Sequence, residues 1–138
     1  MSLVPTLLLV TTASLFGGMV FFPSVVAPMV FRVLDTDAAG RFLRALFPRY
    51  YTFMIATSGL GAAFAGIAGR WRDAVILLLV ALSTLAVRQL LVPAINRWRD
   101  AGRAGDDAAA RRFERGHRLS VGINMIQLVA VLVVLWPG

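Results

Sequence analysis

The stretch DAVILLLVALSTLAVRQLLVPAIN, residues 73–96, sets the architecture of this chain, because it is apolar and long enough to cross a lipid bilayer. Arg88 interrupts it, eight residues before the polar run that begins at Asn96. At the rise of an α-helix, Arg88 then lies roughly 12 Å inside the membrane boundary. An arginine side chain is too short to reach the headgroups from that depth, so we expect Arg88 to meet a polar partner inside the protein. None of the seven acidic residues lies in the interior of an apolar stretch, since Asp73 stands at the first position of this one, so the sequence offers Arg88 no carboxylate at its depth.

Composition places the whole chain in a membrane. The 138 residues are 59% hydrophobic, the mean hydropathy is +0.77, and the apolar residues come in long blocks. We therefore predict one all-α domain, residues 1–138, built as an integral membrane four-helix bundle. Its spans are expected at about residues 3–31, 50–69, 74–95 and 118–136.

Two connections carry further predictions. Residues 36–47 have the apolar spacing of a short amphipathic helix, which we expect to lie on the membrane surface between the first and second spans, with Asp35 or Thr36 as its cap and Pro48 as its end. Pro23 and Pro28 predict kinks in the first span. Residues 97–116 are expected to form a cytoplasmic loop, in which Asp106 caps a helix that continues into the fourth span.

Charge predicts the orientation. The net charge is +7, and all fourteen basic residues are arginines. Eleven of them fall in the connections on one side of the predicted membrane, whereas Arg70 and Arg72 fall on the other. This asymmetry predicts a multi-pass protein of the cytoplasmic (inner) membrane with both termini on the non-cytoplasmic side. It also explains the basic charge without a nucleic-acid partner.

The second span is rich in small residues. Ser58, Ala62 and Gly66 recur at four-residue intervals, a spacing that lets helix backbones approach closely. Packing within the bundle is the favoured interpretation, and homo-oligomerisation remains an alternative.

Four polar residues share one face of the fourth span. His117, Ser120, Asn124 and Gln127 are spaced by three, four and three residues, which places them on one side of an otherwise apolar helix. Lipid would disfavour such a stripe, so it is expected to face the interior of the bundle.

The other spans carry polar residues at a similar depth. Ser24, Ser58, and either Arg88 or Gln89 each lie seven or eight residues in from the cytoplasmic end of their span, as Asn124 does. A polar layer contributed by four helices could bind a ligand. The alternative is that these side chains only bond one another and stabilise the bundle.

Signs of metal or catalytic chemistry are weak. His117 is the only histidine, and the chain has no cysteine, so thiolate chemistry is excluded. Met29 and Met54 lie at a depth similar to that of His117, which leaves a His/Met copper site or a single haem ligand as a remote option against an ordinary interfacial histidine. A Ser-His-Asp triad lacks a buried acid, and there is no phosphate-binding loop. A role other than catalysis is favoured.

Several segments together resemble a known family. They are GGMVFFPSVVAPMVF (residues 17–31), LFPRYY (residues 46–51), Pro93, and an F-x3-H-x2-S-x3-N pattern formed by Phe113, His117, Ser120 and Asn124. The chain resembles the transmembrane protein 205-like family, domain of unknown function 4149. That family is similar to four-helix membrane proteins of the copper-resistance D and protoporphyrinogen oxidase type, some of which bind haem or copper. The resemblance implies a four-helix membrane fold and gives no role to the matched residues.

These observations yield three hypotheses on function. The first is an intramembrane polar pocket that faces the cytoplasm and binds a small anionic or polar ligand, or a lipid headgroup, through Arg88 and the polar layer. The second is a haem- or copper-dependent redox protein centred on His117. The third is a structural subunit of a larger membrane complex.

Overall fold

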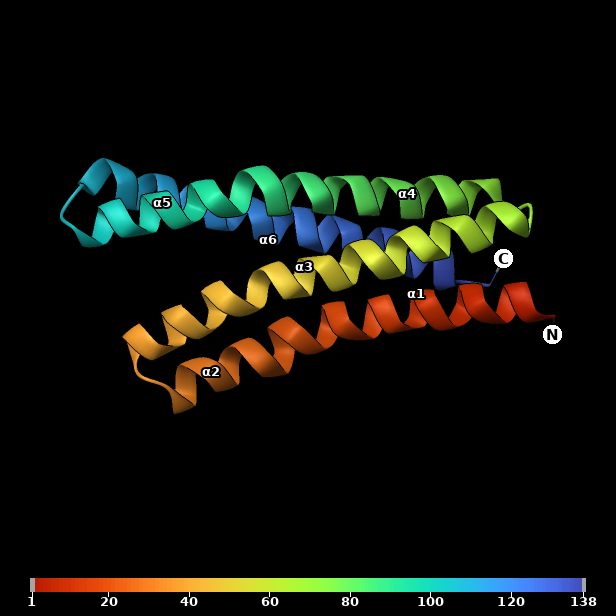
Figure 1. The fold of residues 1–138 in the computed structure, drawn as a ribbon, viewed down its shortest axis with the longest axis horizontal. Coiled ribbons are helices and arrows are strands. Elements are labelled where there is room, and N and C mark those ends of the chain that lie inside the picture. The colour runs from red at the N-terminus through yellow and green to blue at the C-terminus, as the bar shows by residue number, and fades with distance from the viewer. Residues whose placement is uncertain (1, 138) are drawn as a thin grey trace.

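The computed structural model describes residues 2–137, which form four long antiparallel helical rods and no strand. The first rod contains α1 (Leu3–Phe21), the π-helical segment η1 (Phe22–Val26) and α2 (Ala27–Val33). The second is α3 (Thr36–Ile67) alone. The third contains α4 (Trp71–Ala86), the π-helical segment η2 (Val87–Leu91) and α5 (Val92–Arg103), and the fourth is α6 (Asp107–Leu135). Figure 1 shows the rods side by side.

Three of these rods are long and apolar enough to cross a bilayer. They are Leu3–Val33, Trp71–Arg103 and Asp107–Leu135, whose most apolar windows have mean hydropathies of 1.8, 2.3 and 2.0. Large apolar side chains remain exposed along them; on α4, Leu79 is 60% exposed and Leu82 is 53% exposed. Such faces are stable when lipid covers them. The protein is therefore a multi-pass helical membrane protein.

The connections between rods are short and well capped. The side chain of Asp35 accepts a hydrogen bond from the backbone N–H of Ala38 at the start of α3, and that of Asp106 accepts one from Ala109 at the start of α6. Gly69 and Gly105 have φ angles of +74° and +108°, which glycine adopts without strain. The predicted capping by Asp106 is confirmed, and so is the helix that continues from it into the fourth span. Residues 97–103 of the predicted loop are not loop, because they belong to α5, and only residues 104–106 separate α5 from α6.

The predicted interfacial helix at residues 36–47 is also wrong as a separate element. It is the first part of α3, which runs without interruption through Pro48. A proline inside a helix costs about 3 kcal/mol, so packing must hold both sides of it. Before the proline, Ala39 and Leu43 are buried in a cluster with Val30 of α2.

The prolines of the first and third rods act through π-helical turns. In η1 the backbone N–H of Ala27 bonds to the carbonyl of Phe22, and in η2 that of Val92 bonds to Val87, so both bonds span five residues. Each donor directly precedes a proline, Pro28 or Pro93. The wider turn relieves the contact between the proline ring and the carbonyl four residues earlier. The predicted distortion near Pro23 and Pro28 thus takes the form of η1.

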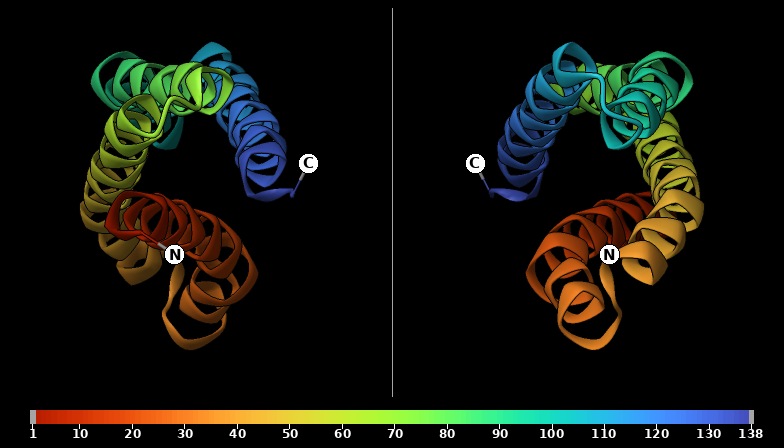
Figure 2. Two further views of the ribbon diagram at one scale, coloured as in Figure 1. Left: turned by 90° about the vertical axis from the view of Figure 1, so that its right-hand side faces the viewer. Right: turned by 90° about the vertical axis from the view of Figure 1, so that its left-hand side faces the viewer.

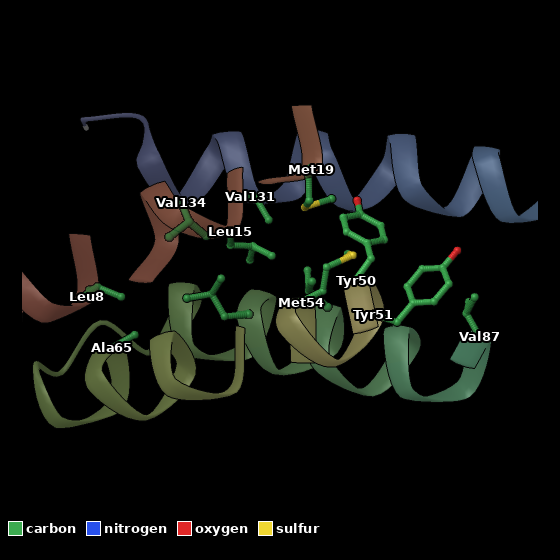
Figure 3. Close-up of a cluster of buried hydrophobic side chains, with 12 residues drawn as sticks. Leu8, Leu15, Met19, Tyr50, Tyr51, Met54, Ala65, Val87, Val131 and Val134 are labelled. Carbon is green, nitrogen blue, oxygen red and sulfur yellow. The ribbon is translucent and has the colours of Figure 1, made fainter. Parts of the chain in front are cut away.

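The hydrophobic core runs along the axis of the bundle between α1, α3, α4 and α6 (Figure 3). Leu15, Met54, Leu77 and Val131 are fully buried at its centre. Leu8, Ala65 and Val134 lie at one end of the cluster, and Tyr50, Tyr51 and Val87 lie at the other.

The rods differ at their two ends. The α2–α3 and α5–α6 connections lie at one end, and most of the arginines lie in the helix ends beside them, whereas the α3–α4 connection and both termini lie at the other end (Figure 1). At the arginine-rich end α1 gives way to α2, whose main neighbour in another rod is α3, while α1 packs against both α3 and α6. Viewed along the rods, the first rod and α6 form the two arms of a C (Figure 2).

Candidate functional site

A cavity of about 490 Å³ lies between the arms of the C, in the half of the bundle nearer the arginine-rich end. The first rod lines it from Met19 to Phe31, α3 lines it from Leu43 to Tyr51, and α6 lines it from His117 to Leu128. Most of the lining is apolar. Three of the four rods therefore contribute to one site.

Four of the sequence-predicted residues line this cavity: Ser24, His117, Ser120 and Asn124. The amide nitrogen of Asn124 donates to the hydroxyl of Tyr50 over 3.3 Å, and the Tyr50 ring extends toward α6 in Figure 3. Ser120 donates to the carbonyl of His117 over 2.7 Å. At this cavity, the predicted stripe of α6 thus makes one contact between helices, through Asn124, and one contact inside the helix, through Ser120.

Aromatic rings form the floor of the cavity. Phe22 of η1 stacks on Tyr50, with ring centroids 4.4 Å apart and planes 15° apart. Phe47 lies 5.2 Å from Phe22 and 6.0 Å from Tyr51 between ring centroids. Such stacked pairs hold the rings in place. The π-helical turn at Pro23 positions Phe22 for this contact.

A smaller cavity of about 120 Å³ adjoins the first on the side of the arginine-rich end. Six residues line both cavities: Phe31, Leu43, Phe47, Tyr51, His117 and Ser120. Beyond them, the smaller cavity reaches Arg44, Asn96 and Arg99. The guanidinium of Arg44 is 2.8 Å from the carboxylate of Asp100, whereas Arg99 forms no ion pair with an acidic residue within residues 2–137. We call the two adjoining cavities the lateral groove.

Arg88 and Gln89 lie outside the lateral groove. Both belong to η2, and the Nε of Arg88 donates to the backbone carbonyl of Pro48 over 3.2 Å, while its terminal nitrogen donates to the Gln89 side-chain oxygen over 2.7 Å. The polar partner expected for Arg88 is therefore a carbonyl of α3 and a neighbouring amide. Neither residue lines the two cavities.

Gln127 and Ser58 are also separate from the groove. The amide nitrogen of Gln127, which is 6% exposed, donates to the hydroxyls of Ser83 and Thr84 of α4 over 2.8 and 3.0 Å. Ser58 is fully buried and donates to the carbonyl of Met54 in its own helix. The residues predicted to form one polar layer therefore bond in separate places in the bundle.

The weak metal candidates do not gather around the histidine. Met54 is fully buried in the core, Met29 is 52% exposed, and neither lines the lateral groove with His117. The ring of His117 is exposed and stacks on Phe113, with centroids 6.2 Å apart. Within residues 2–137, no group of three or more His, Cys, Asp or Glu side chains is arranged to hold a metal ion.

The sequence prediction missed several groove residues. Neither Tyr50 nor Arg44 was assigned to a site from the sequence. Arg99 was counted only as loop charge. A signal existed for Phe22, which is close to Ser24 in the sequence, but not for Tyr50, which stands at the start of the predicted span at residues 50–69. Their stacking is a feature of the tertiary structure.

Comparison with family models identifies the chain. Residues 10–104 match the family described as Domain of unknown function (DUF4149). The protein belongs to this family. Comparisons with curated proteins and with solved structures give no match.

The match places two rods and most of a third within the DUF4149 domain. It includes Phe22, Arg44, Tyr50 and Arg99, which line the lateral groove together with α6. The F-x3-H-x2-S-x3-N pattern begins at Phe113, beyond the matched range. In this DUF4149 protein, the groove is thus formed by the family domain together with the helix that follows it.

Proposed function

We propose that this protein binds one anionic lipid in the lateral groove, with an acyl chain in the larger cavity and the headgroup beside Arg44, Asn96 and Arg99. The observation that carries the proposal is the junction of the two cavities, which joins an aromatic and aliphatic wall to an arginine-lined end. The proposal keeps the polar-ligand hypothesis drawn from the sequence but moves the anion from Arg88 to this end.

The larger cavity suits an acyl chain. Its volume of about 490 Å³ lies within the range of roughly 300–1,000 Å³ that is usual for small-molecule sites. Phe22, Phe31 and Met125 provide apolar lining, and the bond between Tyr50 and Asn124 satisfies the polar groups that a chain would desolvate. An apolar chain can therefore enter without leaving these two groups unpaired.

The smaller cavity suits an anionic headgroup. Arg44 and Arg99 bring two positive charges, and Asp100 compensates only one of them. Guanidinium groups bind phosphate oxygens through paired hydrogen bonds. Each arginine near an anionic membrane surface contributes about 1 kcal/mol to such attraction. The cavity therefore favours an anionic headgroup over a zwitterionic one.

The proposal includes a membrane and an orientation. The arginine-rich end would face the cytoplasm in the inner membrane, with α3 as a further span, so the headgroup site would lie in the anionic cytoplasmic leaflet.

Single cysteines test the orientation, because the chain has none of its own. An impermeant thiol reagent added outside should label cysteines at the exposed Ser2 and Ala68 and should not label those at Ala45 and Ala110; the reverse labelling would contradict the orientation.

Lipid binding can be tested with a cavity-filling substitution. Val121 lines the larger cavity, whereas Val129 lies outside it on the same helix and is 60% exposed. Native mass spectrometry of protein in mild detergent should show preferential retention of phosphatidylglycerol over phosphatidylcholine. Val121→Trp should reduce this retention, and Val129→Trp should leave it unchanged. Equal retention in the two variants would refute the groove as the binding site.

The headgroup contact has its own test. Arg99→Gln should weaken phosphatidylglycerol binding about fivefold, the equivalent of about 1 kcal/mol, and leave phosphatidylcholine binding unchanged. An equal loss for both lipids would show that the arginine acts through packing on Gly40, which its guanidinium approaches closely.

The hypotheses of a redox protein and of a structural subunit can be tested with the same preparation. If the protein is a haem- or copper-dependent redox protein, it should show a visible absorption band or stoichiometric copper that is lost in His117→Ala. If the protein is a structural subunit of a larger complex, other membrane proteins should co-purify with it in a constant ratio.

A further inference from the structure

A second cavity lies at the opposite end of the bundle, where the α3–α4 connection meets the two termini of the rods. It has a volume of about 670 Å³, and three segments line it: the first turns of α1, residues 69–73, and the end of α6. It shares no lining residue with the lateral groove. We call it the terminal cavity.

Two arginines and one aspartate form its charged part. Asp73, in the first turn of α4, is 3% exposed, and its two carboxylate oxygens lie 2.5 Å from the guanidinium of Arg70 and 3.0 Å from that of Arg72. Both arginine side chains remain about half exposed. One buried carboxylate thus orients two guanidiniums, and the cluster keeps a net positive charge.

This charge determines what the cluster can bind. A guanidinium carries five N–H donors, and the contacts with Asp73 use only some of them. A cation would be repelled, since Asp73, the only acidic side chain among the described residues that line the cavity, is already paired with two positive groups. An anion with several acceptor oxygens can bond to the remaining donors of both arginines.

A buried hydroxyl gives a second, independent indication of a ligand. Thr12 of α1 lines the terminal cavity and is 1% exposed, and its hydroxyl has no hydrogen-bond partner within residues 2–137. Buried polar groups without partners are rare in folded proteins because they are costly. A bound oxygen atom would satisfy this hydroxyl.

We propose that the terminal cavity binds a phosphate group through Arg70 and Arg72, with the Thr12 hydroxyl as an additional contact. Asp73 is a positioning residue that holds the two arginines. The phosphate belongs either to a lipid headgroup or to a free phosphate in solution. Trp71 and Trp136 line the cavity and are 69% and 68% exposed, as expected for tryptophans at a membrane surface.

Two substitutions test the site with limited risk to folding. Arg72→Gln removes a half-exposed guanidinium, and Thr12→Val keeps the shape of a side chain that has no bond to lose. Each should raise the apparent Kd for the phosphate probe about fivefold, the size of one net hydrogen bond. Arg118→Gln is the matched control, because Arg118 lies near the other end of α6, where it pairs with Glu114 over 2.9 Å.

The probes separate the two sources of phosphate. Inorganic phosphate is titrated in a thermal-shift assay, and phosphatidylglycerol retention is measured by native mass spectrometry in the Val121→Trp background, where the lateral groove is filled. Stabilisation by inorganic phosphate that depends on Arg72 indicates a free phosphate. Retention of the lipid alone, with the same dependence, indicates a headgroup.

Other results overturn the proposal. If neither probe binds, or if Arg72→Gln, Thr12→Val and Arg118→Gln behave alike, the terminal cavity does not bind phosphate. The use of the Val121→Trp background keeps this outcome distinct from a failure of lipid binding in the lateral groove.

Discussion

The hydrogen bonds of Gln127 offer the sharpest test of the bundle interior. Its amide nitrogen donates to the hydroxyls of Ser83 and Thr84 over 2.8 and 3.0 Å. Gln127→Met keeps the length of the side chain and removes both bonds. A hydrogen bond between membrane helices contributes about 0.6 kcal/mol on average, so the two bonds together contribute about 1.2 kcal/mol.

A larger loss is not expected, because neither hydroxyl is left unpaired. Both Ser83 and Thr84 donate to the carbonyl of Val80, over 3.1 and 2.7 Å. In Gln127→Met, each hydroxyl therefore loses a hydrogen bond that it accepts, and no buried donor is left without a partner.

The assay is an equilibrium unfolding measurement in mixed micelles, analysed by double-mutant cycles. Gln127→Met combined with Thr84→Val should show a coupling free energy of about 0.6 kcal/mol, and Gln127→Met combined with Ser83→Ala should show a similar value. Val129→Leu, on the exposed side of α6, serves as a control with little effect. Coupling energies of zero in both cycles would refute the inward position of Gln127.

Two further predictions concern close helix contacts and surface charge. A Cβ at Gly116 would lie 2.9 Å from Ile95 and Trp98, whereas one at Gly122 would meet no atom within 4 Å; Gly116→Ala should therefore destabilise the α5–α6 pair by about 1–3 kcal/mol, and Gly122→Ala should be neutral or slightly stabilising in the same unfolding assay. The hydrogen bond from Arg103 lowers the pKa of the exposed Asp37 below its ordinary value of 3.8, so its stabilising contact is complete above that value and is lost as the pH falls below it. Thermal melting between pH 6 and pH 3 should show a smaller decrease for Asp37→Asn than for the wild type, and an equal decrease would show that the contact does not contribute.

Some of the site could be predicted because the signal is periodic. The three-, four- and three-residue spacing of His117, Ser120, Asn124 and Gln127 placed them on one face of α6, and two of them, Asn124 and Gln127, do bond to other helices. Equal depth along different helices was a weaker guide. It grouped Arg88 with Asn124, although the two side chains bond to different partners.

The accommodation of Pro48 shows where local reasoning ends. From the sequence, a proline after an amphipathic segment predicts the end of a helix. In the fold, Leu43 packs on α2 before the proline and Tyr51 packs in the core after it, and both contacts favour a continuous α3. This continuity places Arg44 at the lateral groove, where the sequence alone gave it no role.

The sequence by itself determined that this protein is an α-helical membrane protein and that Asp106 caps α6. Those properties depend on hydropathy, charge and capping, which act over a few consecutive residues or one helical turn. Only the tertiary structure decided that α3 is continuous, that Arg88 bonds to Pro48, and that the lateral groove and the terminal cavity exist. These features depend on packing between segments far apart in the chain; Arg88 and Pro48, for example, are 40 residues apart. The free energy of such contacts depends on residues that are distant in the sequence, so a local sequence pattern does not predict it.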